Sequence, residues 1–224
     1  MTIKINGHEK RIGLALSGGG FRAAGFHLGV MRELQRLGIL PTLDLVSCVS
    51  GGSIAGGMLV ANWGNPPEGL NKLEKYLKTR SIAVASVIGG ILDPFESRLD
   101  KLAASYDRDL FAGVTLAALK NGPRVYFNTT NLATGNLFFF VAGGGGEEEL
   151  GEHELGTGKD SNFLVSRAVA ASSAFPPSSH RFGCIRTSIN QGPQWNTSRS
   201  PTAACTTTWL SIRSCVWPAM RSTT

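Results

Sequence analysis

Ser50 has the surroundings of a nucleophile. It stands in Cys-Val-Ser-Gly-Gly-Ser, at the end of the apolar run 43–50 and directly ahead of a helix-like stretch. A serine at a sharp strand-to-helix turn with small neighbours has the geometry of a nucleophile elbow, in which the hydroxyl points outward and can attack a carbonyl carbon. The N–H of Gly51 would then donate to the oxyanion that forms.

A glycine run thirty residues earlier offers more donors of the same kind. Gly18, Gly19 and Gly20 follow the apolar run 11–17 and precede a second helix-like stretch. Glycines in that place expose backbone N–H groups at a helix N-terminus, where they attract negative charge. We expect these three glycines to supply further oxyanion donors and Arg22 to hold their loop in shape. The alternative for Arg22 is an ordinary residue on the surface of the helix.

Two other interpretations of these residues stay open on the sequence. A dinucleotide-binding loop would need an acidic residue at the end of the second strand to bind ribose. Asp44 starts that strand and Ser50 ends it, so the pattern favours an oxyanion over a nucleotide. Ser50 could also simply cap the following helix, as many serines do.

The elements that position these residues alternate between strand and helix. The runs 11–17 and 43–50 read as short buried strands, and each is followed by a stretch with apolar residues at helical spacing. This order predicts parallel strands and an α/β fold, with three layers and a mostly parallel central sheet.

Later segments add further elements. Residues 71–79 predict a surface helix, residues 123–143 predict two strands around a Thr-Gly turn, and the glycine-rich residues 143–160 predict a loop or a disordered excursion. Ser-Asn-Phe-Leu-Val-Ser-Arg-Ala-Val-Ala-Ala-Ser-Ser-Ala-Phe predicts a capped helix that ends at Pro176-Pro177.

The two motifs resemble those of the patatin-like phospholipases and acyl hydrolases. Ser-Gly-Gly-Gly-Phe-Arg matches the oxyanion motif of that family, Gly-Gly-Gly-x-Arg, and residues 48–52 match its Gly-x-Ser-x-Gly with Cys48 in place of the first glycine. The resemblance covers roughly residues 10–177. It implies hydrolysis of lipid acyl esters (phospholipase A, lysophospholipase or lipase chemistry) by a Ser–Asp dyad, with Ser50 as nucleophile and an acyl-enzyme intermediate.

The aspartate of that dyad is missing. The resemblance places it in an Asp-Gly-Gly or Asp-Gly-Ala motif some twenty or more residues beyond the last predicted helix, and this chain has no acidic residue after Asp160. Asp107 and Asp109 are the substitutes within the family-like part, but loop carboxylates are most often solvated or capping groups.

A shifted reading frame accounts for the missing residue. If one base is lost after the Pro177 codon, residues 178–183 can be read as Val-Phe-Pro-Pro-Val-Arg, and residues 202–209 as Asp-Gly-Gly-Val-Tyr-Asp-Asn-Leu. The dyad aspartate then falls at Thr202. We therefore interpret residues 1–177 as an incomplete acyl hydrolase domain and residues 178–224 as an out-of-frame tail, which we expect to be disordered.

Composition agrees with this division. The net charge is +6, but residues 178–224 hold five Arg, no Lys and no acidic residue, so residues 1–177 carry a net charge of only +1. We therefore expect no nucleic-acid partner. The absence of a signal-like N-terminal stretch predicts a cytoplasmic protein, with transient contact with a membrane surface.

These patterns are compatible with three alternative functions. The first is a lipid acyl ester hydrolase, without metal or other cofactor, whose activity is impaired by the missing aspartate. The second is a non-catalytic module that binds lipid or nucleotide through its glycine loop. The third is an inactive pseudogene product.

Overall fold

A computed structural model gives the fold, and it describes residues 3–5, 8–81, 98–131 and 134–174. Thr202 and the tail 178–224 lie outside these residues, as do Pro176 and Pro177. Among the described helices, none combines the length and the hydropathy that a membrane span requires.

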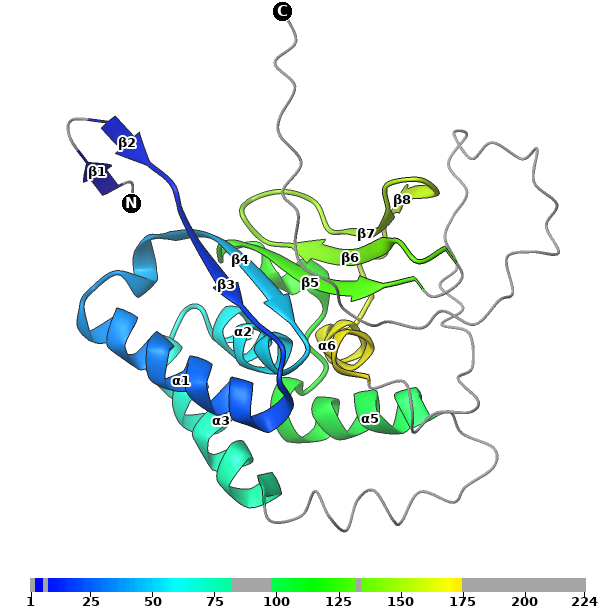
Figure 1. Cartoon of the computed structure of the whole chain (residues 1–224), viewed down its shortest axis with the longest axis horizontal. Coiled ribbons are helices and arrows are strands. Elements are labelled where there is room, and N and C mark those ends of the chain that lie inside the picture. The colour runs from blue at the N-terminus through cyan, green and yellow to red at the C-terminus, as the bar shows by residue number, and fades with distance from the viewer. Residues whose placement is uncertain (1–2, 6–7, 82–97, 132–133, 175–224) are drawn as a thin grey trace, which may run out of the picture.

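A six-stranded sheet forms the centre of the described part (Figure 1). Its strands follow one another in space as they do in sequence: β3 (Ile12–Leu16), β4 (Leu43–Val49), β5 (Arg124–Thr130), β6 (Leu137–Ala142), β7 (Glu149–Glu152) and β8 (Gly156–Gly158). The pairs β3–β4 and β4–β5 are parallel, whereas β5–β6, β6–β7 and β7–β8 are antiparallel. A separate antiparallel pair, β1 (Ile3–Ile5) and β2 (His8–Lys10), precedes the sheet.

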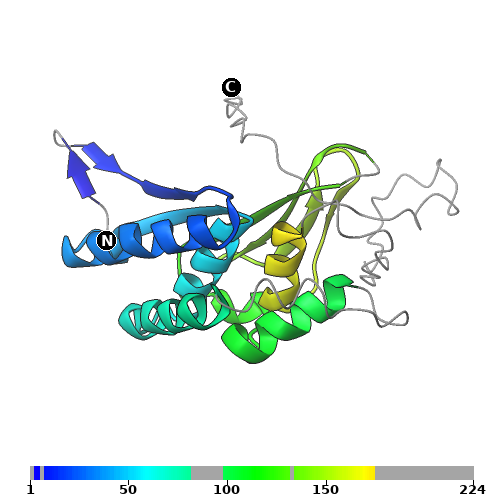
Figure 2. The same ribbon diagram turned by 60° about the horizontal axis from the view of Figure 1, so that its bottom comes forward.

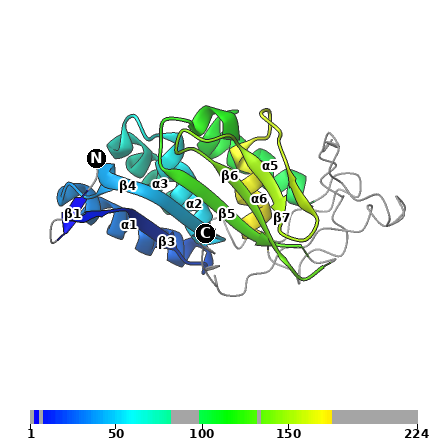
Figure 3. The ribbon, with the colours of Figure 1, turned by 90° about the horizontal axis from the view of Figure 1, so that it is seen from above.

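The α-helices of the described residues lie on one side of this sheet (Figures 2 and 3). They are α1 (Gly20–Arg36), α2 (Gly51–Ala61), α3 (Pro66–Ser81), α5 (Arg98–Tyr106) and α6 (Val165–Ser173). Helix α2 occupies the middle and touches α1, α3 and α6 as well as β3, β4 and β5. Shorter helical turns at Leu40–Thr42, Asp107–Phe111 and Leu116–Leu119 connect the elements.

Burial explains why α2 takes the central place. Ten of its eleven residues are buried, because it carries apolar and small residues on all sides. A helix that is apolar all round must be enclosed. The strands contribute alternate residues to the same core, among them Val46 and Cys48 of β4 and Val125 and Phe127 of β5, all fully buried.

The structure confirms the α/β fold with parallel strands at its start. The sheet as a whole is mixed, with two parallel and three antiparallel pairs, where a mostly parallel sheet was predicted. The described helices lie on one of its sides (Figures 2 and 3), so the described part has two layers where three were predicted. Strands β3 and β4 fall on the two predicted apolar runs and pair in parallel. The predicted hairpin is β5–β6, with Thr134 and Gly135 in its turn. Parallel pairing ends at β5, because the short turn to β6 allows only an antiparallel return.

Two further expectations are wrong. Residues 143–160 are not only a loop, because they contain β7 and β8, and β7 pairs with β6 along its whole length. Leu150 and Glu152 of β7 are buried, so pairing and burial outweigh the weak strand propensity of this glycine-rich segment. Helix α6 also lacks a side-chain cap, since Leu164 is its N-cap residue.

Candidate active site

The turn at Ser50 has the backbone of a strained elbow. Ser50 joins β4 to α2 with φ 52° and ψ −117°, a conformation that residues with a Cβ rarely adopt. Its side chain forms no capping hydrogen bond with α2, so the helix-cap alternative is wrong. Such strain persists only where the surroundings over-determine it, and it concentrates at functional sites.

The glycine loop and the elbow are in direct contact. A Cβ added at Gly51 would stand 2.1 Å from the carbonyl oxygen of Gly20, and one at Gly52 would stand 2.2 Å from that of Leu16. Real Cβ atoms do not approach other atoms so closely, so both positions of α2 require glycine. The two motifs, thirty residues apart in sequence, therefore form one structural unit at the ends of β3 and β4.

Unused backbone donors gather in this unit. The N–H groups of Gly18, Gly19, Gly20 and Gly51 form no hydrogen bond with another described residue. Gly18, Gly19 and Gly20 are exposed, and Gly51 is the first residue of α2. The positive end of a helix dipole and free N–H groups both favour an anion.

His27 holds the strand end that leads into the loop. Its side chain is buried on α1, and its Nε2 lies 3.0 Å from the carbonyl oxygen of Ser17. Because a carbonyl only accepts, Nε2 must carry the proton and donate it. Arg22, by contrast, is exposed and has no hydrogen bond or ion pair with a described residue. Its loop-supporting role stays a prediction.

Cys48 is a buried packing residue of β4. A Cβ at Gly56 of α2 would stand 2.2 Å from its Sγ, so the missing side chain at Gly56 makes room for the sulfur. Burial raises the pKa of the Cys48 thiol far above its usual range. The thiol therefore stays neutral and unreactive.

Two residues on other elements stabilise the elbow through hydrogen bonds, and sequence analysis did not identify either of them as a site residue. Asn128 of β5 is buried, and its Nδ2 donates to Ser47 Oγ at 2.8 Å and to the carbonyl oxygen of Cys48 at 3.1 Å. Ser172 of α6 is buried too, and its Oγ accepts from the backbone N–H of Ser50 at 3.0 Å. No local pattern marks either residue, because each acts across elements distant in sequence.

No described carboxylate forms a hydrogen bond with Ser50. The Oγ of Ser50 forms no hydrogen bond with any described residue. Asp107 caps its own turn by accepting from Gly113 N–H at 3.1 Å, and Asp109 pairs with Arg108 at 3.0 Å. These contacts are the capping and surface roles expected of loop carboxylates.

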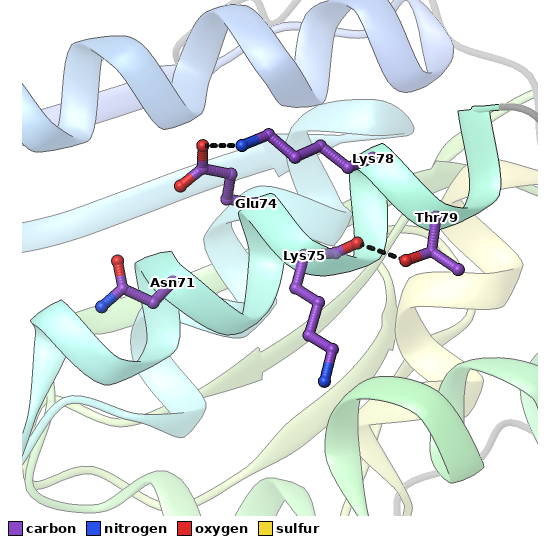
Figure 4. A pocket seen from close by; sticks show the side chains of 5 residues that line it. All are labelled: Asn71, Glu74, Lys75, Lys78 and Thr79. Atoms are coloured by element: carbon purple, nitrogen blue, oxygen red, sulfur yellow. Dashed lines mark hydrogen bonds and ion pairs between the residues drawn. The ribbon is translucent and has the colours of Figure 1, made fainter.

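A hollow on the surface of α3 is lined by none of the residues of this unit (Figure 4). Glu74 in it pairs with Lys78 at 2.7 Å, and hydrogen bonds from Lys78 and Arg32 lower the pKa of Glu74. The lining residues of the hollow are all polar or charged, and no aliphatic or aromatic side chain among them could receive an acyl chain. Its residues are Asn71, Glu74, Lys75, Lys78 and Thr79.

One comparison with known proteins agrees with the two motifs. A family model described as Patatin-like phospholipase matches residues 14–181. Two solved structures of human GIVD cytosolic phospholipase A2, with methyl gamma-linolenyl fluorophosphonate and with that inhibitor and terbium chloride, match at 17% identity and a TM-score of 0.47. Each match covers 73% of this chain and 29% of the other. No curated protein sequence matches significantly.

Proposed function

The chain belongs to the patatin-like phospholipase family, and from this premise we propose that its site is built to hydrolyse lipid acyl esters with Ser50 as the nucleophile. The observation that carries the proposal is the contact of the glycine loop with the strained elbow, at Gly20 and Gly51. It brings a serine and a set of unused N–H donors to one place, as acyl transfer requires. Phospholipids, lysophospholipids and neutral lipids are the proposed substrate class.

The reaction begins with attack of Ser50 Oγ on the ester carbonyl carbon. The carbonyl oxygen gains a negative charge, which the N–H groups of Gly51 and of the loop Gly18–Gly20 stabilise. The alcohol leaves as the acyl-enzyme forms, and water releases the fatty acid. Preorganised donors of this kind contribute about 10²–10³ in rate for each donor.

The proton of Ser50 has no acceptor among the described residues. A serine hydroxyl is a weak nucleophile without an adjacent base. We therefore expect severely impaired or absent hydrolysis in the chain as written. The proposed base is the aspartate that the shifted frame would place at Thr202.

A serine-directed fluorophosphonate probe tests the proposal on the full chain. We expect slow formation of a phosphorus–oxygen bond at Ser50, with loss of fluoride, seen as a mass increase that Ser50→Ala abolishes. Labelling that survives in Ser50→Ala would contradict the assignment of the nucleophile.

The other two functions give different results in the same assay. A folded protein that is not labelled and binds nucleotide or lipid tightly would be a binding module. Poor solubility with a broad melting transition would indicate a product without function. We also propose a cytoplasmic location with transient membrane contact, which flotation with phospholipid vesicles measures.

A further inference from the structure

We propose that Ser172 is a positioning residue that holds the backbone of Ser50 in the elbow conformation. This inference rests on the proposed function for the role of Ser50, but its first step is a matter of hydrogen bonds alone. Ser172 is 2% exposed and belongs to the last turn of α6, 122 residues from Ser50.

The hydrogen-bonding groups around Ser172 Oγ allow only one arrangement of protons. A hydroxyl has one hydrogen to donate and two lone pairs to accept. The carbonyl oxygen of Asn128, 2.7 Å away, can only accept, so Ser172 donates to it. The Ser50 N–H can only donate, at 3.0 Å. Ser53 Oγ, 2.7 Å away, must then donate to the remaining lone pair.

The one hydrogen and both lone pairs of the Ser172 hydroxyl are therefore engaged in hydrogen bonds. Each of the three partners belongs to a different part of the molecule. Asn128 lies on β5, Ser50 is the elbow, and Ser53 lies in the first turn of α2. All three partners would lose a hydrogen bond together if the hydroxyl were removed, and the bonds to Asn128 and Ser53 are buried. Loss of a buried partner costs more than a hydrogen bond contributes on average.

The bond to Ser50 acts on the strained torsion directly. It fixes the plane of the peptide between Val49 and Ser50, while contacts with β3, β4 and β5 fix α2 on the other side of the turn. The φ of Ser50, 52°, is the rotation between these two fixed parts. Without Ser172 Oγ, the turn can relax toward a commoner conformation and take the nucleophile away from the oxyanion donors.

The same hydrogen bond excludes the backbone N–H of Ser50 as an oxyanion donor. Because Ser50 N–H is engaged with Ser172, it is not free to donate to an oxyanion. The donors that remain at the elbow are those of Gly51 and of the glycine loop. Helix α6 thus contributes to the site without touching the reacting atoms.

Hydrogen exchange of the Ser50 amide tests the proposal independently of any activity. The variant is Ser172→Ala in the full chain, and the matched control is Ser166→Ala, a buried serine of the same helix whose Oγ has no hydrogen-bond partner among the described residues. We expect the Ser50 amide to exchange about tenfold faster or more in Ser172→Ala, and unchanged in Ser166→Ala. Labelling of Ser50 by the fluorophosphonate should slow by a similar factor in Ser172→Ala alone.

The outcomes separate this inference from the proposed function. A Ser50 amide that exchanges equally in both variants, or an unchanged labelling rate despite faster exchange, would overturn the role of Ser172. If the parent chain is never labelled, the proposed function fails, while faster exchange in Ser172→Ala still supports the positioning role. Should Ser172→Ala not fold, Ser172→Cys keeps a weak donor and acceptor and should give a smaller increase in exchange.

Discussion

The backbone of Gly51 lies against that of Gly20, so that a Cβ on Gly51 would stand 2.1 Å from the Gly20 carbonyl oxygen. This contact joins the start of α2 to the start of α1 and closes the site between the two parallel strands that precede them. The contact leaves no room for a side chain at Gly51, so the residue type at the start of α2 depends on the glycine loop before α1.

Replacement of Gly51 should separate the two motifs. Gly51→Ala pushes a methyl group into backbone atoms that cannot rotate away, and we expect a loss of about 3 kcal/mol or more in the free energy of unfolding. Thermal or urea unfolding of the full chain measures it. The matched control is Gly29→Ala on α1, where a Cβ meets nothing within 4 Å. That variant should gain up to about 1 kcal/mol; equal effects at both positions would contradict the contact.

Cys48 and Gly56 should behave as a coupled pair. Gly56→Ala alone places a Cβ 2.2 Å from Cys48 Sγ and should cost about 1–3 kcal/mol. Cys48→Ala leaves its own Cβ 3.6 Å from the new methyl group, an ordinary contact. The double variant should therefore recover stability, with a coupling energy of about 0.5–3 kcal/mol in a double-mutant cycle. Strict additivity would show that the sulfur is free to move.

Alkaline pH should destabilise the protein through Cys48. Burial raises the pKa of this thiol in the folded state, so its contribution is fully present below the pKa of the unfolded thiol, about 8.5. Above that pH the unfolded chain releases a proton that the folded chain keeps, and stability falls by about 1.4 kcal/mol per pH unit. Tyr106, whose pKa burial also raises, should add to the loss above about pH 10.

Unfolding experiments between pH 7 and 11 measure this slope. Cys48→Ala should flatten the part that begins near pH 8.5 and leave the Tyr106 part unchanged. An identical slope in parent and variant would mean that Cys48 ionises as easily in the folded state as in the unfolded one.

Restoring the reading frame after Pro177 should restore ester hydrolysis, whereas a single substitution should not. Thr202→Asp alone should not restore hydrolysis, because the residues around it stay out of frame. A chain translated in the shifted frame after Pro177 should hydrolyse a lipid ester and lose that activity in Ser50→Ala. Sequencing independent DNA across codons 170–210 is the matching measurement. Full activity of Thr202→Asp would contradict the frameshift hypothesis.

Local chemistry was sufficient to predict much of the fold. The runs 11–17 and 43–50 are apolar, flanked by glycine and too short for helices, and they are β3 and β4. The place of Ser50 at the end of β4 followed from the same pattern. Glycine-rich residues 143–160 misled the prediction, because the pairing of β7 with β6 is a tertiary contact that composition does not report.

What the sequence by itself determined, then, is the strand–turn–helix order and the residue types at the two turns. Glycine and serine at those turns encode a tight backbone and an exposed hydroxyl. Only the tertiary structure decided that Gly20 meets Gly51, that Gly56 makes room for Cys48, and that Ser172 and Asn128 brace the elbow. Each of these contacts joins residues of different structural elements. Hydrogen bonds and van der Waals contacts depend on distance in space, so no local sequence pattern predicts them.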